Sequence, residues 1–218
     1  MDKDSPRAAL YAYFWQKLIE KTFRDQLIEK LWPPGGSRLM TMFYQILREP
    51  QNRWWDDATT PELIETRDEI LTSAFERAYE LCVEDLGGKP EEWKWRDVHL
   101  AAFRNETLGE SGIGPIEAIF NRGPVGVDGG VGQVNPNNWR YDEPFEVKHI
   151  ASMRMIVDLG DFSNSQMMHT TGQSGHPGHR HYDDFIERWQ IIRYHPAPWG
   201  RSEVEKSSKK RLVLKPKN

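Results

Sequence analysis

Cysteine, long apolar runs and an excess of positive charge are all scarce in this sequence. Cys82 is the single cysteine, which excludes a disulfide framework and a cysteine-rich metal site. No apolar run approaches the ~20 residues that span a bilayer. The first residues also lack the apolar core of a signal peptide, so if the parent protein is exported we expect its signal upstream. The net charge of −4 lacks the basic face that nucleic acid requires. We expect neither nucleic acid nor a membrane as a partner.

Tryptophan, by contrast, is abundant. The chain holds nine tryptophans in 218 residues, and such large rings usually pack on broad surfaces with the indole N–H directed at a partner. The hydrophobic fraction of 38% and the length are those of a folded domain that can bury a sizeable core. We expect part of the surface that the tryptophans cover to belong to another chain segment.

The first 88 residues are predicted to be mainly helical. Ser5 followed by Pro6 is a favourable helix start, because the serine hydroxyl can cap free N–H groups and proline suits the first turn. An apolar residue then recurs every fourth position, at Tyr11, Trp15, Ile19, Phe23, Leu27 and Leu31. This stripe predicts a helix that runs to the Trp-Pro-Pro-Gly-Gly segment at 32–36.

Two further helices are predicted before residue 88. A short one covers 38–47, ahead of a polar, tryptophan-bearing loop at 50–59. Thr60 and Pro61 are expected to open a long helix that ends at Gly87 and Gly88, with Leu63, Arg67, Ile70, Ala74, Ala78 and Leu81 tracing one face. Core packing explains both long stripes better than a cofactor role does.

From residue 90 the texture changes to short motifs separated by glycine and proline. Twelve of the 17 glycines lie between Gly109 and Gly178, so helix cannot dominate there. Candidate strands cover 152–159, 166–171, 191–195 and 211–214, and a short helix covers 182–189. The sequence therefore predicts an α+β chain, taken as one segment of 1–218 that is mainly helical over 1–88 and mixed over 89–218.

A serine hydrolase elbow was sought around Ser174. Gly172-Gln173-Ser174-Gly175-His176 lacks the last glycine of the Gly-x-Ser-x-Gly motif. His169 and His176 are possible bases, but no spacing ties them to Ser174, and a triad cannot be recognised from nearness in sequence. The sequence therefore gives little support to Ser174 as a catalytic nucleophile.

A histidine cluster follows directly. His176, His179 and His181, with Asp183 and Asp184 behind them, are residue types that hold zinc or another transition metal. The cluster lacks the helical His-Glu-x-x-His spacing, and Glu187 is too distant for a cupin pattern. Histidines in such a glycine-rich loop are more often solvated or bonded to backbone, but a metal-binding module stays open as the alternative.

The glycine-rich run at 123–132 is a third motif. Its glycine content is similar to that of a phosphate loop, but no Gly-Lys-Ser/Thr follows it and no strand-to-helix context surrounds it. We interpret it as a tightly turning loop, at an active-site rim or on an ordinary surface, in which glycine permits positive φ angles and close backbone approach. The residue types alone yield no convincing catalytic constellation.

The order of several motifs nevertheless resembles a known family. They are Asp2 to Ala8 (Asp-x-x-Ser-x-x-Ala), Trp54-Trp55-Asp56-Asp57, Trp93-Lys94-Trp95 with His99, Asn121-Arg122-Gly123-Pro124 with Gly129-Gly130, 154–158 (Arg-Met-Ile-Val-Asp), Gly172-Gln173-Ser174-Gly175, and His181-Tyr182-Asp183-Asp184 with Trp189. Together they resemble the carboxy-terminal end of the β subunit in the penicillin amidase (penicillin acylase) family of N-terminal-nucleophile hydrolases. Arg96 departs from the family, where glycine commonly follows the second tryptophan, and the histidine-rich loop at 175–181 is unusual.

The resemblance implies an αββα sandwich, of which this chain would be a carboxy-terminal portion, and an enzyme that hydrolyses acyl amides such as β-lactam side chains or acyl homoserine lactones. Family members cut their own precursor to expose a serine that uses its α-amino group as the base. Met1 stands first here, so we expect an engineered start or a split gene. The serine, the oxyanion donors and any calcium site would lie upstream, leaving no catalytic, cofactor or metal residue in this chain.

Expectations about partners and location follow from the same resemblance. The chain alone would be inactive, and its partner would be the missing upstream part of the same precursor, the α subunit and the amino-terminal β section. The full enzyme would be a periplasmic or secreted bacterial protein that takes an acyl-amide small molecule. A non-catalytic interaction protein on the acylase scaffold is a further alternative, and it predicts self-association through exposed apolar surface.

Overall fold

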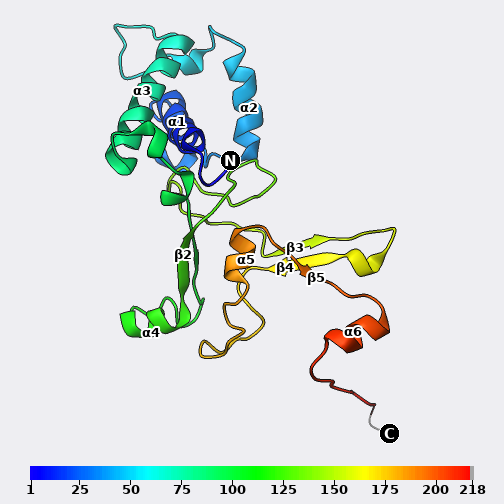
Figure 1. Ribbon diagram of the computed structural model, residues 1–218. Coiled ribbons are helices and arrows are strands. Elements are labelled where there is room, and N and C mark those ends of the chain that lie inside the picture. The colour runs from blue at the N-terminus through cyan, green and yellow to red at the C-terminus, as the bar shows by residue number, and fades with distance from the viewer. Residues whose placement is uncertain (217–218) are drawn as a thin grey trace. The chain divides into compact units, whose positions relative to one another are not determined.

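The computed structural model describes residues 1–216 and divides the chain into two compact units. Met1–Ala151 form the first unit, and the second begins at Ser152. Helices and strands both occur, as the ribbon in Figure 1 shows. The predicted α+β class is therefore confirmed. None of the helices within 1–216 is long and apolar enough to cross a bilayer.

The first helix begins where the sequence predicts. Helix α1 spans Pro6–Phe23, and the Ser5 hydroxyl caps it by accepting a hydrogen bond from the Ala8 N–H at 3.3 Å. Its inward face contains Ala9, Ala12, Leu18, Ile19 and Phe23, each at most 2% exposed. Apolar residues at helical spacing thus form one face of α1, which packs on the core of the first unit.

The predicted end of this helix, near Trp32, is wrong. The chain leaves α1 after Phe23, and a short 3₁₀ helix, η1 (Glu29–Leu31), follows. The Trp32 indole donates to the Leu27 carbonyl at 2.9 Å, which is the carbonyl that a continuing helix would offer to the Leu31 N–H. Apolar spacing continued past the helix, but Ile28 and Leu31 are 68% and 60% exposed.

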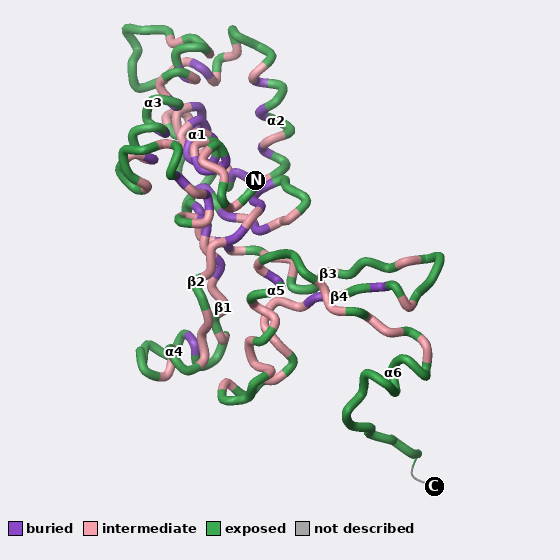
Figure 2. Tube along the Cα trace, in the orientation of Figure 1, coloured by how far each residue is buried: buried purple, intermediate pink, exposed green. Residues whose placement is uncertain are grey.

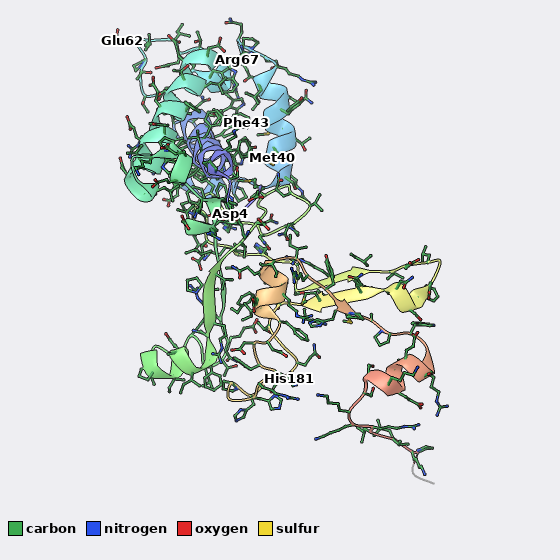
Figure 3. All side chains as sticks on the ribbon, viewed as in Figure 1. Asp4, Met40, Phe43, Glu62, Arg67 and His181 are labelled. Atoms are coloured by element: carbon green, nitrogen blue, oxygen red, sulfur yellow. The ribbon has the colours of Figure 1, made fainter. Side chains whose placement is uncertain are left out.

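Helix α2 confirms the predicted short helix almost residue for residue. It spans Ser37–Leu47 and buries Leu39, Phe43 and Ile46. The Phe43 ring meets the Trp15 ring of α1 edge-on, with centroids 5.3 Å apart, and Figure 3 labels it where α2 faces α1. Aromatic contacts of this geometry stabilise a core beyond simple area burial.

The second long helix starts later than predicted. Helix α3 spans Arg67–Leu86, and Thr66 with Glu69 forms a complete capping box at its start. The predicted cap, Thr60, instead uses its hydroxyl to contact the Asp57 carbonyl and the Glu65 carboxylate. Thr60-Pro61 therefore lies in a turn, because the Thr66 capping box satisfies the first free N–H groups better. The predicted end at Gly87 is confirmed.

Helices α1 and α3 pack against each other through small side chains. On α3 the buried residues are Ile70, Ala74, Ala78 and Cys82, and the buried stretches of both helices are purple in Figure 2. Alanines on both helices allow the two backbones to come close, which increases the number of dispersion contacts between them. The core of the first unit therefore lies between its helices.

Several tryptophan side chains donate an indole hydrogen bond to a backbone carbonyl, in some cases next to the end of a helix. Five indole N–H groups bond to a backbone oxygen: Trp15 to Gly35, Trp32 to Leu27, Trp55 to Glu49, Trp93 to Gly87 and Trp95 to Gly129. The prediction that indole N–H groups find partners is confirmed for these five. Carbonyls near the ends of α2 and α3, which lack helical partners, are satisfied in this way.

The first unit also contains a two-stranded ribbon that the sequence did not reveal. Strand β1 (Leu100–Phe103) pairs antiparallel with β2 (Arg122–Gly126), and helix α4 (Gly114–Phe120) lies between them in sequence. Both strands are short, and alanine, glycine and proline, all of which disfavour strands, make up much of them. Three further 3₁₀ turns, η2 (Arg53–Trp55), η3 (Pro90–Glu92) and η4 (Trp95–Asp97), complete the unit.

The second unit is built on a three-stranded antiparallel sheet in the order β3-β4-β5. Strands β3 (Met153–Ile156) and β4 (Gln166–His169) confirm two predicted strands. Between them lies the 3₁₀ turn η5 (Phe162–Asn164). Helix α5 (Ile186–Gln190) overlaps the second half of the short helix predicted at 182–189. Trp189 of α5 is completely buried, and Arg154 donates to its carbonyl at 2.7 Å.

Two predicted strands near the end of the chain are wrong. Strand β5 covers only His195–Pro196, because the backbone turns at Ile192, which has a φ of +56°. The apolar run at 211–214 forms no strand; it follows helix α6 (Arg201–Ser207), and Leu212 and Leu214 are more than 80% exposed. An apolar run without a neighbouring strand has no ladder to join.

Candidate functional site

The loop that contains Gly172 and Ser174 closes on itself. The Ser174 N–H donates to the His181 carbonyl at 2.9 Å, and the Phe185 N–H donates to the Thr171 carbonyl at 2.8 Å. A Cβ atom on Gly172 would lie 2.3 Å from the His181 carbonyl oxygen, which is far inside van der Waals contact. Glycine is therefore required at 172 for the two arms of the loop to meet.

Ser174 is placed as a turn residue. Its hydroxyl accepts a hydrogen bond from the His176 N–H at 3.1 Å, the local pattern by which serine stabilises turns. In the described part of the chain, no imidazole is bonded to this hydroxyl. The nucleophile interpretation of Ser174, with His169 or His176 as base, lacks the serine–base contact that it requires.

The three loop histidines organise backbone. The Nδ1 atoms of His176 and His179 accept hydrogen bonds from the N–H groups of Gly178 and His181, at 3.1 and 3.2 Å. His181, labelled in Figure 3, places its own Nδ1 2.7 Å from the Asp184 carboxylate. Each ring thus fixes the path of the chain close to itself.

The same contacts bear on the metal hypothesis. Within residues 1–216 no group of three or more His, Cys, Asp or Glu side chains is arranged to hold a metal ion. The alternative of a metal-binding module on His176, His179 and His181 is therefore corrected. The Nδ1 atoms of the three rings contact two backbone amides and a carboxylate, so these atoms are not directed at a common point as tetrahedral zinc ligands must be.

The glycine-rich run at 123–132 holds the amino-terminal residues. The Lys3 N–H donates to the Asp128 carboxylate at 2.6 Å, and the Gly129 N–H donates to the Met1 carbonyl at 2.7 Å. Gly129 has a φ of +88°, and a Cβ atom there would lie 2.1 Å from the Asn135 carbonyl oxygen. The predicted tight turn is confirmed for residues 127–132, whereas residues 123–126 belong to strand β2. The polar groups of the turn are used for internal structure.

Arg96, the departure from the family pattern, belongs to the same arrangement. Its N–H donates to the Lys3 carbonyl at 2.8 Å, and its guanidinium lies 3.2 Å from the Asp4 carboxylate. A Cβ atom on Gly126 would lie 2.4 Å from the Arg96 carbonyl oxygen. Arg96 therefore contacts both the amino-terminal segment and strand β2.

His99 has a pKa far below the ordinary value for histidine. Its ring is completely buried and stacks on Trp95, with centroids 4.3 Å apart and planes 13° apart. Nδ1 lies 2.9 Å from the Phe145 carbonyl, and because a carbonyl only accepts, Nδ1 carries the proton. Burial lowers the pKa of His99 to about 4, although hydrogen bonding to the backbone of Phe145 and Asn137 opposes the shift. A neutral, packed ring is a structural element.

A cavity of about 490 Å³ lies in the first unit. Several of its charged side chains are paired with each other. Glu20 contacts Lys17 at 2.7 Å and Arg24 at 2.6 Å, and the Arg140 guanidinium binds Asp142 through two hydrogen bonds. Burial raises the pKa of Tyr141 to about 12. These ion pairs hold Glu20 and Asp142 against cations, which makes the two carboxylates poor candidates for a general base.

The comparisons with known proteins identify what these loops belong to. Residues 1–206 match the family described as penicillin amidase, so the chain belongs to the penicillin amidase family. Its similar relatives include acyl-homoserine lactone acylase QuiP of Pseudomonas aeruginosa, 28% identical with 97% of this chain and 27% of the relative covered. The enzyme of the same name from Pseudomonas putida is 29% identical, with 97% and 26% covered.

The coverage is as informative as the identity. The chain spans about a quarter of the length of the curated relatives that it matches. The predicted resemblance to the family is confirmed, and the loop at 172–184 lies within the matched residues, although its own geometry is that of a turn. The sequence and structure assign no catalytic, cofactor or metal residue within the described part of the chain, and that assignment stays a prediction.

Proposed function

We propose that this chain is the carboxy-terminal part of the β subunit of an acylase that hydrolyses acyl amides, and that it supplies scaffold to an active site formed elsewhere in the enzyme. The observation that carries the proposal is the family match over residues 1–206 combined with coverage of about 27% of a relative. Most of such an enzyme lies outside these residues.

The proposed reaction follows the family resemblance. The hydroxyl of an amino-terminal serine, exposed by self-cleavage of a precursor, attacks the acyl carbon while its own α-amino group takes the proton. The amine leaves, and water then hydrolyses the acyl ester and releases the acid. Backbone N–H groups and an asparagine amide stabilise the oxyanion. A calcium ion, where present, binds in the same upstream section, and the enzyme works in the periplasm or outside the cell.

Acyl homoserine lactones are the substrate class that we favour. The relatives from two Pseudomonas species are both named for that activity. The bond cleaved is the amide between a fatty acyl chain and the lactone amine. Side-chain amides of β-lactams are the second class, supported by the family description alone.

The test compares the 218-residue chain with the complete acylase polypeptide that carries it. Each is incubated with an N-acyl homoserine lactone, and released homoserine lactone is measured by chromatography. We expect hydrolysis only by the complete, self-cleaved enzyme, and the same rate from a Ser174→Ala variant because Ser174 stabilises a turn. Hydrolysis by the 218-residue chain alone, or its loss in Ser174→Ala with the fold retained, would contradict the proposal.

A further inference from the structure

Helix α4 is apolar but buries nothing. Five of its seven residues are apolar, Pro115, Ile116, Ala118, Ile119 and Phe120, and none of its residues is buried. Ile113 and Ile119 are 53% and 55% exposed, and Leu108 in the loop before the helix is 39% exposed. A helix that is apolar nearly all round is normally covered. Figure 2 shows this tip of the β1–β2 ribbon mostly in the colour of exposed residues.

Polar contacts within the loop and helix hold the tip in shape. The Asn121 carboxamide oxygen accepts from the Asn105 N–H at 2.9 Å, and its NH₂ group donates to the Gly109 carbonyl at 2.8 Å. The Glu117 carboxylate accepts from the Gly112 N–H at 2.7 Å. A Cβ atom on Gly109 would overlap Asn121. The loop and helix are thus ordered before anything binds, which lowers the entropy cost of docking.

The ribbon that carries the tip also lacks cover. A lone two-stranded ribbon is only marginally stable in water, and a third strand or a packed surface usually completes it. Pro124 and Val125 of β2 are exposed or half-buried, and of the β1 residues only Ala101 is buried. Leu108, Ile113 and Ile119 at the tip and Pro124 on the ribbon are therefore exposed apolar side chains.

We propose that the tip, defined as Leu108, Ile113 and Ile119 on α4 and its preceding loop, docks into the part of the acylase polypeptide that lies outside these 218 residues. The inference rests on the proposed function. The match covers only 27% of a relative's length. An acylase of that length therefore has enough further chain to cover the tip. One charged side chain, Glu117, lies within α4, and it is engaged by the loop, which favours an apolar protein groove.

Thiol labelling can test the docking, because the native cysteine reacts too slowly to contribute to the signal. Cys82 is completely buried, and burial raises the pKa of its thiol to about 12, so it reacts slowly with maleimide. Ile119→Cys and the control Glu76→Cys, an exposed position on the polar face of α3, are labelled in the 218-residue chain and in the complete acylase. We expect Ile119→Cys to react at least tenfold more slowly in the complete enzyme, and Glu76→Cys to change less than threefold.

A double variant tests the same surface from the other side. Ile113→Glu with Ile119→Glu should leave the melting temperature of the 218-residue chain unchanged, because neither side chain is buried in it. It should weaken co-purification with the remaining acylase polypeptide, expressed as a separate chain, at least tenfold. Ile119→Leu is the matched control and should bind as the native chain does.

The outcomes separate this inference from the proposed function. If the complete enzyme hydrolyses acyl amides but Ile119→Cys labels as fast as in the isolated chain, the docking proposal fails and the proposed function stands. If Ile119→Cys is protected in the complete polypeptide but no acyl amide is hydrolysed, docking stands and the proposed activity fails. Protection that appears in the isolated chain as its concentration rises would assign the tip to a second copy and overturn the proposal.

Discussion

His99 shows at the residue scale how burial couples to pH. Its pKa is about 4 in the folded chain, below the ordinary value of 6.5, so the unfolded chain binds more protons between these two values. The contribution of neutral His99 to the free energy of unfolding is therefore fully present above pH 6.5 and is lost as the pH falls toward 4. We expect a loss of roughly 3 kcal/mol at most in the free energy of unfolding, from about 1.4 kcal/mol per pKa unit.

Urea denaturation at pH 7, 6, 5 and 4 measures this loss. His99→Asn removes the titrating ring but keeps a donor near the Phe145 carbonyl, so its stability should change less over the same range. His176→Asn is the control, because His176 is exposed and should retain the native pH dependence. An identical slope for the native chain and His99→Asn would assign the acid sensitivity to other groups.

Gly172 and Gly175 form a matched pair within one loop. A Cβ atom on Gly172 would lie 2.3 Å from the His181 carbonyl, whereas one on Gly175 would meet nothing within 4 Å. We expect Gly172→Ala to destabilise the second unit by about 1 to 3 kcal/mol, as overpacked substitutions do. Gly175→Ala should stay within about 0.5 kcal/mol of the native chain. Hydrogen exchange of residues 166–190 measures both, and equal protection in the two variants would contradict the steric argument.

At the scale of elements, the start of α3 depends on one capping box. Thr66→Ala removes the hydroxyl that bonds to the Glu69 N–H and carboxylate, so we expect a loss of about 1 kcal/mol. Thr72→Ala is the control, because the Thr72 hydroxyl only bonds back to the Asp68 carbonyl within the exposed part of α3. Thermal unfolding followed by circular dichroism compares the two. A larger loss for Thr72→Ala would show that the box is not the determinant.

The helix ends also mark what the sequence could and could not predict. Ser5 and Gly87 act through local chemistry, so the start of α1 and the end of α3 were predictable. The end of α1 was not, because it depends on the Trp32 indole reaching the Leu27 carbonyl, a contact that apolar spacing does not encode. The start of α3 was predicted at Thr60, whereas Thr66 caps the helix because its hydroxyl forms a capping box with Glu69.

The same distinction applies to strands and loops. Strands β3 and β4 have enough apolar residues to be recognised, whereas β1 and β2 form because their sequences are brought into register, Leu100 opposite Gly126. The histidine loop was rightly suspected of bonding to backbone, because histidines in a glycine-rich segment have amide groups nearby. That His99 is stacked and neutral depends on the Trp95 ring and on the Phe145 carbonyl. Phe145 is distant in sequence, and the motif that contains Trp95 and His99 does not reveal how their rings are oriented.

At the scale of the whole molecule, the chain should consist of two separately stable parts. Met1–Ala151 contain a continuous helical core, so we expect a fragment of residues 1–151 to unfold cooperatively, within a few degrees of the same transition in the full chain. Differential scanning calorimetry measures this. A fragment that binds hydrophobic dyes and melts without cooperativity would show that the first unit needs the second to fold.

The indoles that close chain segments also make the molecule its own optical probe. Trp55 and Trp93 are at most 2% exposed, and each holds a carbonyl next to the end of a helix, whereas Trp199 of the second unit is 70% exposed. An indole in a dry environment emits at shorter wavelength than one in water. Loosening of a helix end in the first unit would therefore appear as a red shift in fluorescence before the helix itself is lost, while Trp199 supplies a constant water-exposed background.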